Sequence, residues 1–329
     1  MYSLIRKLLF LMDAESAHDF TIEQIQRIQQ IPIALSLIEG ICRAPRSPRQ
    51  LWGMTFNNPI GIAAGFDKNA LLMPFLAALG FGFLEVGTVT LHPQPGNSKP
   101  RLFRDPEHRA LINRLGFNND GADAIAQRLQ RFDGEIPRFV NIGKNRDVPL
   151  EAAADAYAQC YLRVARWADG TVLNLSSPNT PGLRELQRPE HLLKVLDLVR
   201  AMRDQMPVGR PILVKIAPDL DRAQLAEICE ICKRLADGMI CTNTALTPKG
   251  GLSGMPLFRP STEILGAVRS LVGPDFPLIG VGGIFTADDV RTKLAAGADL
   301  VQVYTGFIYE GPSLPSRLAR QLQGMRAEG

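Results

Sequence analysis

The stretch "PLIGVGGIFTADDVRTKLAAGADLVQVYTG", residues 277–306, contains two short apolar runs separated by a helical pattern. The runs cover residues 277–282 and 299–305, and "ADDVRTKLAAGA" lies between them. Two strands joined by a helix are expected to pair in parallel within one sheet. Units of this kind build either a closed barrel or an open, doubly wound sheet.

Similar runs, rich in Val and Ile, recur along the chain from residue 59 onward. They cover residues 59–64, 83–90, 139–145, 171–176, 211–218 and 238–244, in addition to the two runs above. Eight strands that alternate with helices predict a (β/α)8 TIM barrel. A doubly wound sheet would need a G-x-G-x-x-G turn near the chain start, but Gly280 and Gly282 come late, and Phe285 fills the third glycine position.

Composition excludes several classes of protein. The chain has 329 residues, 46% of them hydrophobic, and a formal net charge of +4, which is too small and dispersed to indicate nucleic-acid binding. The five cysteines form no disulfide framework, and "CEIC" at 229–232 lies in a helical pattern without a second ligand pair. We therefore expect a reducing cytoplasm and no metal site. No segment is long and apolar enough to span a bilayer or to act as a secretion signal.

The N-terminal segment is predicted to form short helices. Leu4, Ile5, Leu8, Leu11 and Met12 share one helical face. The proline-broken, basic stretch 43–50 gives the clearest boundary, so we expect a helical extension over residues 1–45 and a barrel domain over residues 46–329.

Polar residues gather where the predicted strands end. The strands are followed or closed by "GFDKN", "GTVT", "NIGKN", "NLSSPN", "VKIAPD", "CTNT", "GVGG" and "VYTG". Because the carboxyl ends of the strands meet at one rim of a barrel, these groups predict a polar pocket for a cofactor and a substrate.

Three features of this rim invite a chemical interpretation. Lys215 interrupts an apolar strand, and it could form a salt bridge inside the barrel, a Schiff base, or a cation that stabilises a reduced cofactor. The glycines before Thr286 and Asp289, at a predicted helix start, could bind a phosphate or simply form a turn. Asn113 lies in a long connection, residues 111–121, and could cap a turn or contact an imide or a carboxylate.

Taken together, these motifs resemble a known enzyme family over essentially the whole chain. "AAGFDKN", "PQPGNSKPRLFR", "INRLGFNN", "NLSSPNTPGLR", "VKIAPDL", "GGLSG", "IGVGGI" and "AGADLVQVYTGFIYEGP" are similar to dihydroorotate dehydrogenase of the quinone-dependent, membrane-associated class. The resemblance implies an FMN-binding barrel that oxidises dihydroorotate to orotate in pyrimidine synthesis.

The resemblance also implies residues for each ligand. For FMN they are Ala64, Gly65, Thr88, Asn141, Asn174, Lys215, Thr242, Gly254, Gly283, Tyr304 and Thr305. For dihydroorotate and orotate they are Lys68, Asn113, Arg114, Leu115, Gly116, Phe117, Asn174, Asn179, Asn243 and Thr244. For the quinone they are His18, Arg104 and Tyr304.

Ser177 matches the catalytic base of this class. This role would explain why polar residues, "NLSSPN", follow a buried strand. Phe117 and Thr180 match residues that the family uses beside the serine to pass its proton out. Lys215 would place a positive charge near the flavin and favour its reduced form.

The family gives the N-terminal helices a role as the mouth of an apolar tunnel for quinone. We therefore expect peripheral contact with the cytoplasmic face of the cell membrane, with Arg6 and Lys7 near anionic headgroups, and a monomeric protein. Two features, the Leu91-His92 pair and Thr305, depart from common family patterns. Leu91 and His92 stand where relatives often have a proline and a basic residue, so the resemblance does not specify the quinone site at these positions. Thr305 stands where many relatives have serine, and it keeps the hydroxyl.

Three other hypotheses remain at this stage. A tRNA dihydrouridine synthase would need a basic RNA-binding face and usually a further helical domain. A Schiff-base aldolase would use Lys215 as its nucleophile. A membrane-peripheral scaffold would keep a barrel only for its shape, which the polar rim argues against.

Overall fold

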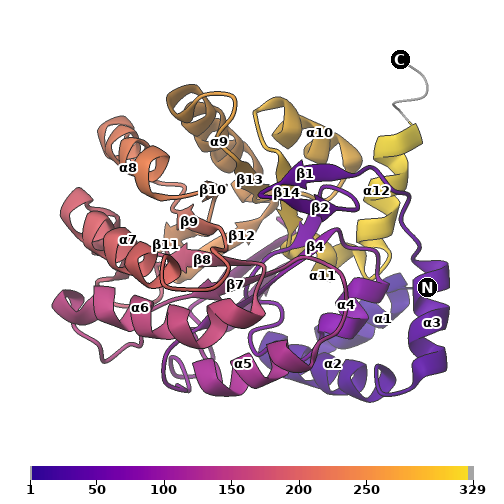
Figure 1. Ribbon diagram of the computed structural model, residues 1–329. Helices are drawn as coiled ribbons and strands as arrows, with labels where there is room; N and C mark the ends of the chain where they lie inside the picture. The colour runs from indigo at the N-terminus through magenta and orange to yellow at the C-terminus, as the bar shows by residue number, and fades with distance from the viewer. Residues whose placement is uncertain (1, 325–329) are drawn as a thin grey trace.

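A closed barrel of parallel strands forms the centre of the computed structural model, which describes residues 2–324 (Figure 1). Its strands are β3 (Ile60–Ile62), β4 (Phe83–Val89), β7 (Arg138–Ile142), β8 (Gly170–Asn174), β9 (Ile212–Ile216), β10 (Gly238–Cys241), β13 (Leu278–Val281) and β14 (Leu300–Val303). Each pairs with the next in this order, and β14 pairs with β3 to close the ring. Every predicted apolar run overlaps one of these strands. The (β/α)8 barrel is therefore confirmed, and the doubly wound alternative is wrong.

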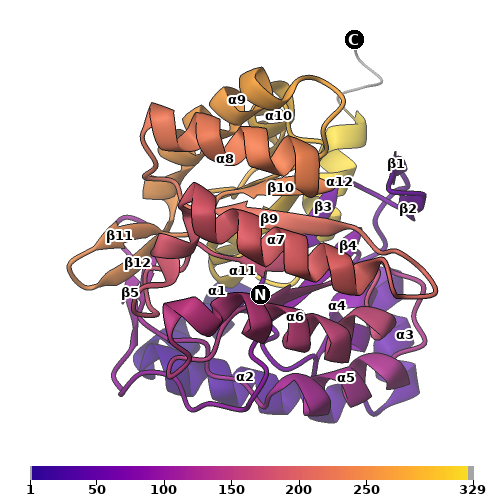
Figure 2. The same cartoon turned by 60° about the vertical axis from the view of Figure 1, so that its left-hand side comes forward.

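Helices surround the barrel and connect its strands (Figures 1 and 2). They are α4 (Met73–Ala78), α5 (Ala122–Arg131), α6 (Ala153–Val164), α7 (Pro189–Arg203), α8 (Arg222–Leu235), α9 (Phe258–Val272), α10 (Ala287–Ala295), α11 (Thr305–Glu310) and α12 (Leu314–Gly324). Short 3-10 turns are η1 (Leu150–Ala152), η2 (Ala165–Trp167), η3 (Leu183–Gln187) and η4 (Met255–Leu257). The helix start predicted at Thr286 is present as the start of α10, where Thr286 and Asp289 form a capping box. Cys229 and Cys232 are buried free thiols on α8.

Aromatic side chains fill the amino-terminal half of the barrel. A hairpin of β1 (Arg49–Leu51) and β2 (Met54–Phe56) brings Phe56 against the rings of Phe83 and Phe139. Trp52 joins this cluster and donates its indole N–H to the carbonyl of Asp237, 2.7 Å away. Because these rings fill the amino-terminal half, the remaining space inside the barrel lies at the carboxyl ends of the strands.

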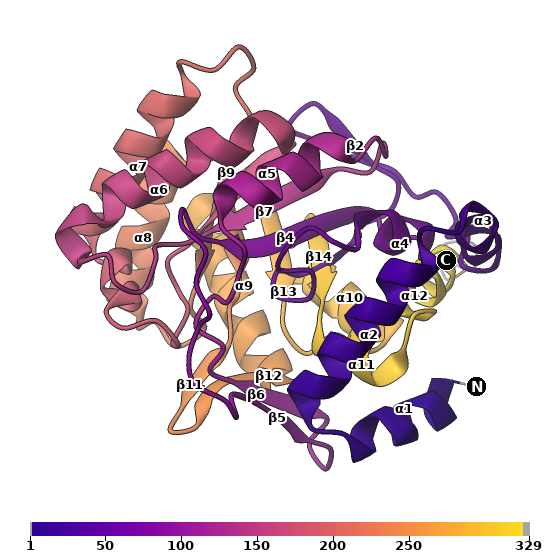
Figure 3. The same cartoon turned by 90° about the horizontal axis from the view of Figure 1, so that it is seen from below.

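A second, antiparallel sheet lies beside those carboxyl ends. It contains β5 (Leu102–Asp105), β6 (Ala110–Asn113), β11 (Ala245–Thr247) and β12 (Gly250–Gly254), in the order β11-β12-β6-β5. Figure 3 shows these strands grouped below the barrel. The stretch 111–121 was expected to be a long loop, but its first residues belong to β6. The expectation failed because β6 pairs with β12, which is about 140 residues away in the chain.

The predicted N-terminal helices are α1 (Tyr2–Leu11), α2 (Ala14–Ile28) and α3 (Pro32–Ile41). In Figure 3 they lie along one side of the barrel, and α2 contacts β5 while α1 contacts α11. A buried ion pair fixes α2, because the Arg101 guanidinium lies 2.8 Å from the Glu15 carboxylate. Among the described residues, no helix is long and apolar enough to cross a membrane. The outer limits of the two expected domains, residue 1 and residues 325–329, lie outside the described residues.

Candidate active site

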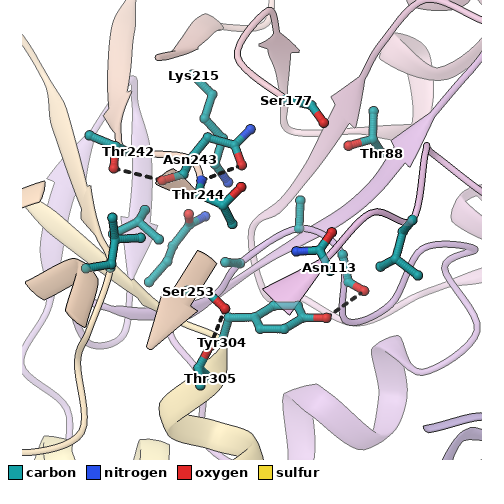
Figure 4. Close-up of a pocket in the computed structure, with 18 of the residues that line it drawn as sticks. Thr88, Asn113, Ser177, Lys215, Thr242, Asn243, Thr244, Ser253, Tyr304 and Thr305 are labelled. Atoms are coloured by element: carbon teal, nitrogen blue, oxygen red, sulfur yellow. Dashed lines mark hydrogen bonds between the residues drawn. The ribbon is translucent and has the colours of Figure 1, made fainter. Parts of the chain in front are cut away.

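A cavity opens at the carboxyl ends of the barrel strands, with about 1000 Å³ of empty space including its open mouth. Side chains from β4, β9 and β14 reach it, as do residues that follow β3, β8, β10 and β13. The second sheet closes one side through Asn113 of β6 and Ser253 of β12 (Figure 4). The predicted rim is therefore one continuous pocket.

Most residues predicted for FMN line this cavity. They are Ala64, Gly65, Thr88, Asn174, Lys215, Thr242, Gly254, Gly283, Tyr304 and Thr305. Asn141 is the exception, since its side chain is fully buried behind the wall and accepts a hydrogen bond from Thr88 Oγ1 at 2.5 Å. Asn141 therefore supports lining residues, and its direct contact with a ligand is not favoured by this placement.

The residues predicted for the substrate also gather in the cavity. They are Lys68, Asn113, Leu115, Gly116, Phe117, Asn174, Asn179, Asn243 and Thr244. Arg114 is the exception, because its guanidinium turns away and donates to the carbonyl of Pro100 at 2.9 Å. A side-chain contact between Arg114 and the substrate is therefore not favoured.

The remaining predicted residues divide between the cavity and its surroundings. Ser177, Phe117 and Tyr304 line it, and Thr180 is buried near Ser177 in the turn after β8. His18 on α2 reaches Lys68, with 3.3 Å between its Nε2 and the lysine Nζ. Arg104 lies outside the cavity, where its guanidinium donates to the carbonyl of Met12, 2.6 Å away.

The asparagines of the cavity hold one another in fixed orientations. Asn174 donates through Nδ2 to Thr88 Oγ1 at 2.9 Å, and its Oδ1 accepts from Asn243 Nδ2 at 3.0 Å. Asn179 Nδ2 donates to Asn113 Oδ1 at 2.9 Å. Because each amide presents both donors and acceptors, the set can match a cyclic imide without further buried charge.

Ser177 lies in the turn that follows β8 and is 5% exposed. Its Oγ accepts a hydrogen bond from the backbone N–H of Asn179, with 3.3 Å between the two atoms. Thr180 Oγ1 is also buried and has no hydrogen-bond partner among the described residues. The cavity therefore presents the Ser177 hydroxyl to a ligand, and the same turn holds a second buried hydroxyl at Thr180.

The sequence prediction missed Gln302, which lines the cavity, and also its hydrogen-bond partner Glu85. Glu85 is fully buried in β4, and its carboxylate oxygens lie 3.4 and 3.5 Å from Nζ of Lys215. The salt bridge that was one of three interpretations of Lys215 is thus present, and Lys215 also lines the cavity. A charged residue within the apolar run "FLEVGTVT" was the available signal, the same one that drew attention to Lys215.

Glycines form a cradle between β13 and α11. Gly282 and Gly283 adopt φ values of +112° and +72°, which favour glycine, and a Cβ on Gly283 would overlap Phe258. A Cβ on Gly306 would overlap the carbonyl of Ile284. Bare backbone N–H groups in such a cradle suit the phosphate of a cofactor.

Burial sets the charge of the groups near Lys68. Desolvation lowers the pKa of Lys68 to about 8, although Asp19, Glu15 and Asp67 partly oppose this shift. Desolvation and then the neighbouring Lys68 cation lower the pKa of His18 well below its usual value. His18 is therefore neutral near pH 7 and can accept a hydrogen bond from Lys68. Burial also raises the pKa of Tyr304 to about 12, so its hydroxyl stays protonated.

The fold and the cavity define an enzyme of the (β/α)8-barrel class, with room for an organic cofactor beside a small polar substrate. The family model that describes dihydroorotate dehydrogenase matches residues 48–325. The chain therefore belongs to the dihydroorotate dehydrogenase family, a family of oxidoreductases.

Relatives and solved structures agree with this assignment. A protein of Alkalilimnicola ehrlichii named dihydroorotate dehydrogenase (quinone) is 47% identical, and the match covers 97% of this chain and 98% of the relative. A protein of the same name from Acidovorax sp. strain JS42 is 44% identical over 99% of both chains. The crystal structure of the Eimeria tenella enzyme in complex with ferulenol has a TM-score of 0.87 and 33% identity, covering 98% of this chain and 95% of that one.

Proposed function

We propose that this protein oxidises dihydroorotate to orotate in pyrimidine synthesis, with FMN as cofactor and a quinone as the final electron acceptor. The names of its relatives support the substrate and the acceptor. The observation that carries the proposal is that Lys68, Ser177 and Lys215, from three separate parts of the chain, line one cavity.

The residues of the cavity fit FMN in three respects. The Gly282–Gly283 cradle suits its phosphate, and Lys215 offers a cation to the electron-accepting ring. Gln302 lines the same cavity, and its buried Oε1 has no hydrogen-bond partner among the described residues, so it can accept from a ring N–H. When bound, FMN supplies a hydride acceptor that can later pass electrons to a quinone.

The chain's own residues provide the acid–base half of the oxidation. The substrate loses a hydride from C6 and a proton from C5, and Ser177 Oγ takes that proton. Lys68 holds the substrate carboxylate, while Asn113, Asn179 and Asn243 bind the ring and orient C5 towards the serine. Phe117 shields this step from bulk water, and Thr180 receives the proton from the serine.

We further propose that α1, α2 and α3 bring the protein to the cytoplasmic face of the membrane and admit the quinone. Large apolar side chains on α1 and α3 are exposed, including Leu8 at 67%, Leu11 at 84% and Ile41 at 75%. Such side chains, with nearby basic residues, suit insertion into a lipid interface. His18 and Tyr304 lie on the quinone's proposed route to the cavity.

A turnover assay tests the proposed function. Purified protein is mixed with dihydroorotate and a short-chain quinone, and orotate is followed by its absorbance, with fumarate and NAD as alternative acceptors. We expect orotate to form with the quinone and far more slowly with the other two. An absence of quinone-dependent orotate formation would contradict the proposal.

A further inference from the structure

A carboxylate sits immediately behind the cation that faces the cavity. We propose that Glu85 is a positioning residue that fixes Lys215 and sets the reduction potential of the bound flavin. This inference rests on the proposed use of FMN. It adds a residue that does not line the cavity itself but controls two residues that do.

Glu85 is the centre of a compact hydrogen-bonded cluster inside the barrel. Its Oε1 accepts from Asn141 Nδ2 at 2.6 Å, and its Oε2 accepts from Gln302 Nε2 at 2.6 Å. Lys215 Nζ lies 3.5 Å from the first oxygen and 3.4 Å from the second. The carboxylate therefore receives donors from β7, β9 and β14 at once.

These contacts orient the amides on both sides of Glu85. Because Gln302 donates its Nε2 to the carboxylate, its Oε1 is the atom left for a ligand in the cavity. Because Asn141 donates its Nδ2, its Oδ1 is free to accept from Thr88 and Asn174. A carboxylate is required for this pattern, since it accepts on both oxygens, whereas a glutamine would present N–H groups to one of the donors.

The electrostatic consequence follows from burial. Glu85 is 0% exposed and Lys215 is 5% exposed, so water screens neither charge well. The pair has no net charge, and the attraction of Lys215 for the additional negative charge of reduced flavin is therefore partly cancelled by Glu85. Removing the negative charge while keeping the lysine should favour reduced flavin and raise its reduction potential.

The test compares the midpoint potential of bound flavin in the wild type and in Glu85→Gln. We expect the equilibrium to shift at least about tenfold towards reduced flavin, which for a two-electron couple is a rise of about 30 mV. Glu310→Gln is the matched control, because Glu310 is paired with Arg109 and Arg317 outside the cavity. Its potential should equal that of the wild type.

The possible outcomes separate this inference from the proposed function. A wild type that binds no flavin would overturn the proposed function. A flavin-bound Glu85→Gln protein with an unchanged or lower potential would overturn only the inference, because removal of the negative charge is expected to raise the potential. If Glu85→Gln retains no flavin, Glu85→Asp keeps the negative charge on a shorter side chain. It should hold flavin with an oxidation–reduction equilibrium within a few-fold of the wild type, and loss of flavin from this variant too would contradict the inference.

Discussion

Ser177 reaches the cavity because β8 ends at Asn174 and the chain then turns through two serines and a proline. Its Oγ accepts a hydrogen bond from a backbone N–H, and among the described residues no histidine or carboxylate is hydrogen-bonded to it. A hydroxyl without a strong base beside it must act in a site that excludes water and hands its proton on.

We predict that Ser177→Ala slows flavin reduction by dihydroorotate by about 10²-fold or more, the usual contribution of a general base. Stopped-flow absorbance under anaerobic conditions measures this rate. Ser316→Ala, which removes a buried hydroxyl on α12, is the control and should reduce flavin at the wild-type rate. Near-normal reduction in Ser177→Ala would remove the serine from its proposed role.

Lys68 should make orotate binding depend on pH. Its pKa of about 8 means that the ammonium is present below pH 8 and is lost above it. Because the substrate carboxylate is negative throughout, affinity should be constant below about pH 7 and should fall above pH 8, approaching about tenfold per pH unit. Titration of the flavin spectrum with orotate between pH 6 and 10 measures this.

Lys68→Arg is the matched variant for that titration, because arginine stays protonated over the whole range. Its orotate affinity should be nearly independent of pH, whatever its absolute value. The same loss of affinity above pH 8 in both proteins would show that another group is responsible.

At the residue scale, the apolar pattern of a barrel strand singled out Lys215 but did not reveal its partner Glu85. The strands of a parallel barrel are apolar on both faces, so a single charged residue stands out, but its direction is not encoded in the pattern. Partnership between Glu85 and Lys215 depends on the barrel closing, because β4 and β9 are separated by β7 and β8 in the ring and meet only across its interior. Only the structure supplies that distance.

At the scale of elements, local patterns predicted the barrel strands but not the second sheet. Each barrel strand is a buried run followed by a recognisable helix. The strands of the second sheet are three to five residues long and half-buried, and β6 and β12 come from connections that are far apart in the chain. Their pairing spans the carboxyl end of the barrel, because β4 and β10 lie on opposite sides of the ring and their long connections meet across it.

Lys293 joins three elements next to the glycine cradle. Its side chain is 0% exposed on α10, and Nζ lies 2.6 Å from Ser261 Oγ of α9 and 3.5 Å from the carbonyl of Val281 in β13. Desolvation lowers its pKa from 10.5 to about 7, although Cys241 and Asp289 partly oppose the shift. The folded protein therefore binds this proton less readily than the unfolded chain does.

The sign of the resulting prediction follows from proton linkage. Between pH 7 and pH 10 the unfolded chain carries up to one more proton on Lys293, so this residue makes the free energy of unfolding rise with pH. In Lys293→Met that contribution disappears. We expect the free energy of unfolding, measured with urea at pH 7 and pH 9, to rise more with pH in the wild type than in the variant. An equal rise in the two proteins would contradict the lowered pKa.

At the scale of the whole molecule, the helical extension and the cavity lie on connected parts of the surface. His18 of α2 contacts Lys68 of the cavity, and Glu15 of the same helix is buried against Arg101 near the second sheet. The outer faces of α1 and α3 are instead apolar and exposed. The sequence predicted the apolar face of α1, but exposure depends on which face the barrel leaves uncovered.

We predict that Leu8→Glu combined with Leu11→Glu weakens binding to anionic phospholipid vesicles at least about tenfold, because burial of each leucine is worth roughly 1.5–3 kcal/mol. Both side chains are exposed, so folding should be unaffected. Co-sedimentation with vesicles measures the binding. Leu162→Glu, at an exposed leucine on α6, is the control and should bind like the wild type. Equal binding by the double variant would contradict a membrane role for α1.

The most direct measurement is the visible absorbance of the purified protein as dihydroorotate is added without oxygen. We predict a flavin spectrum that one equivalent of dihydroorotate bleaches and a quinone restores, since a single cavity would hold both cofactor and substrate. A protein without flavin, or a flavin spectrum that dihydroorotate leaves unchanged, would contradict this account.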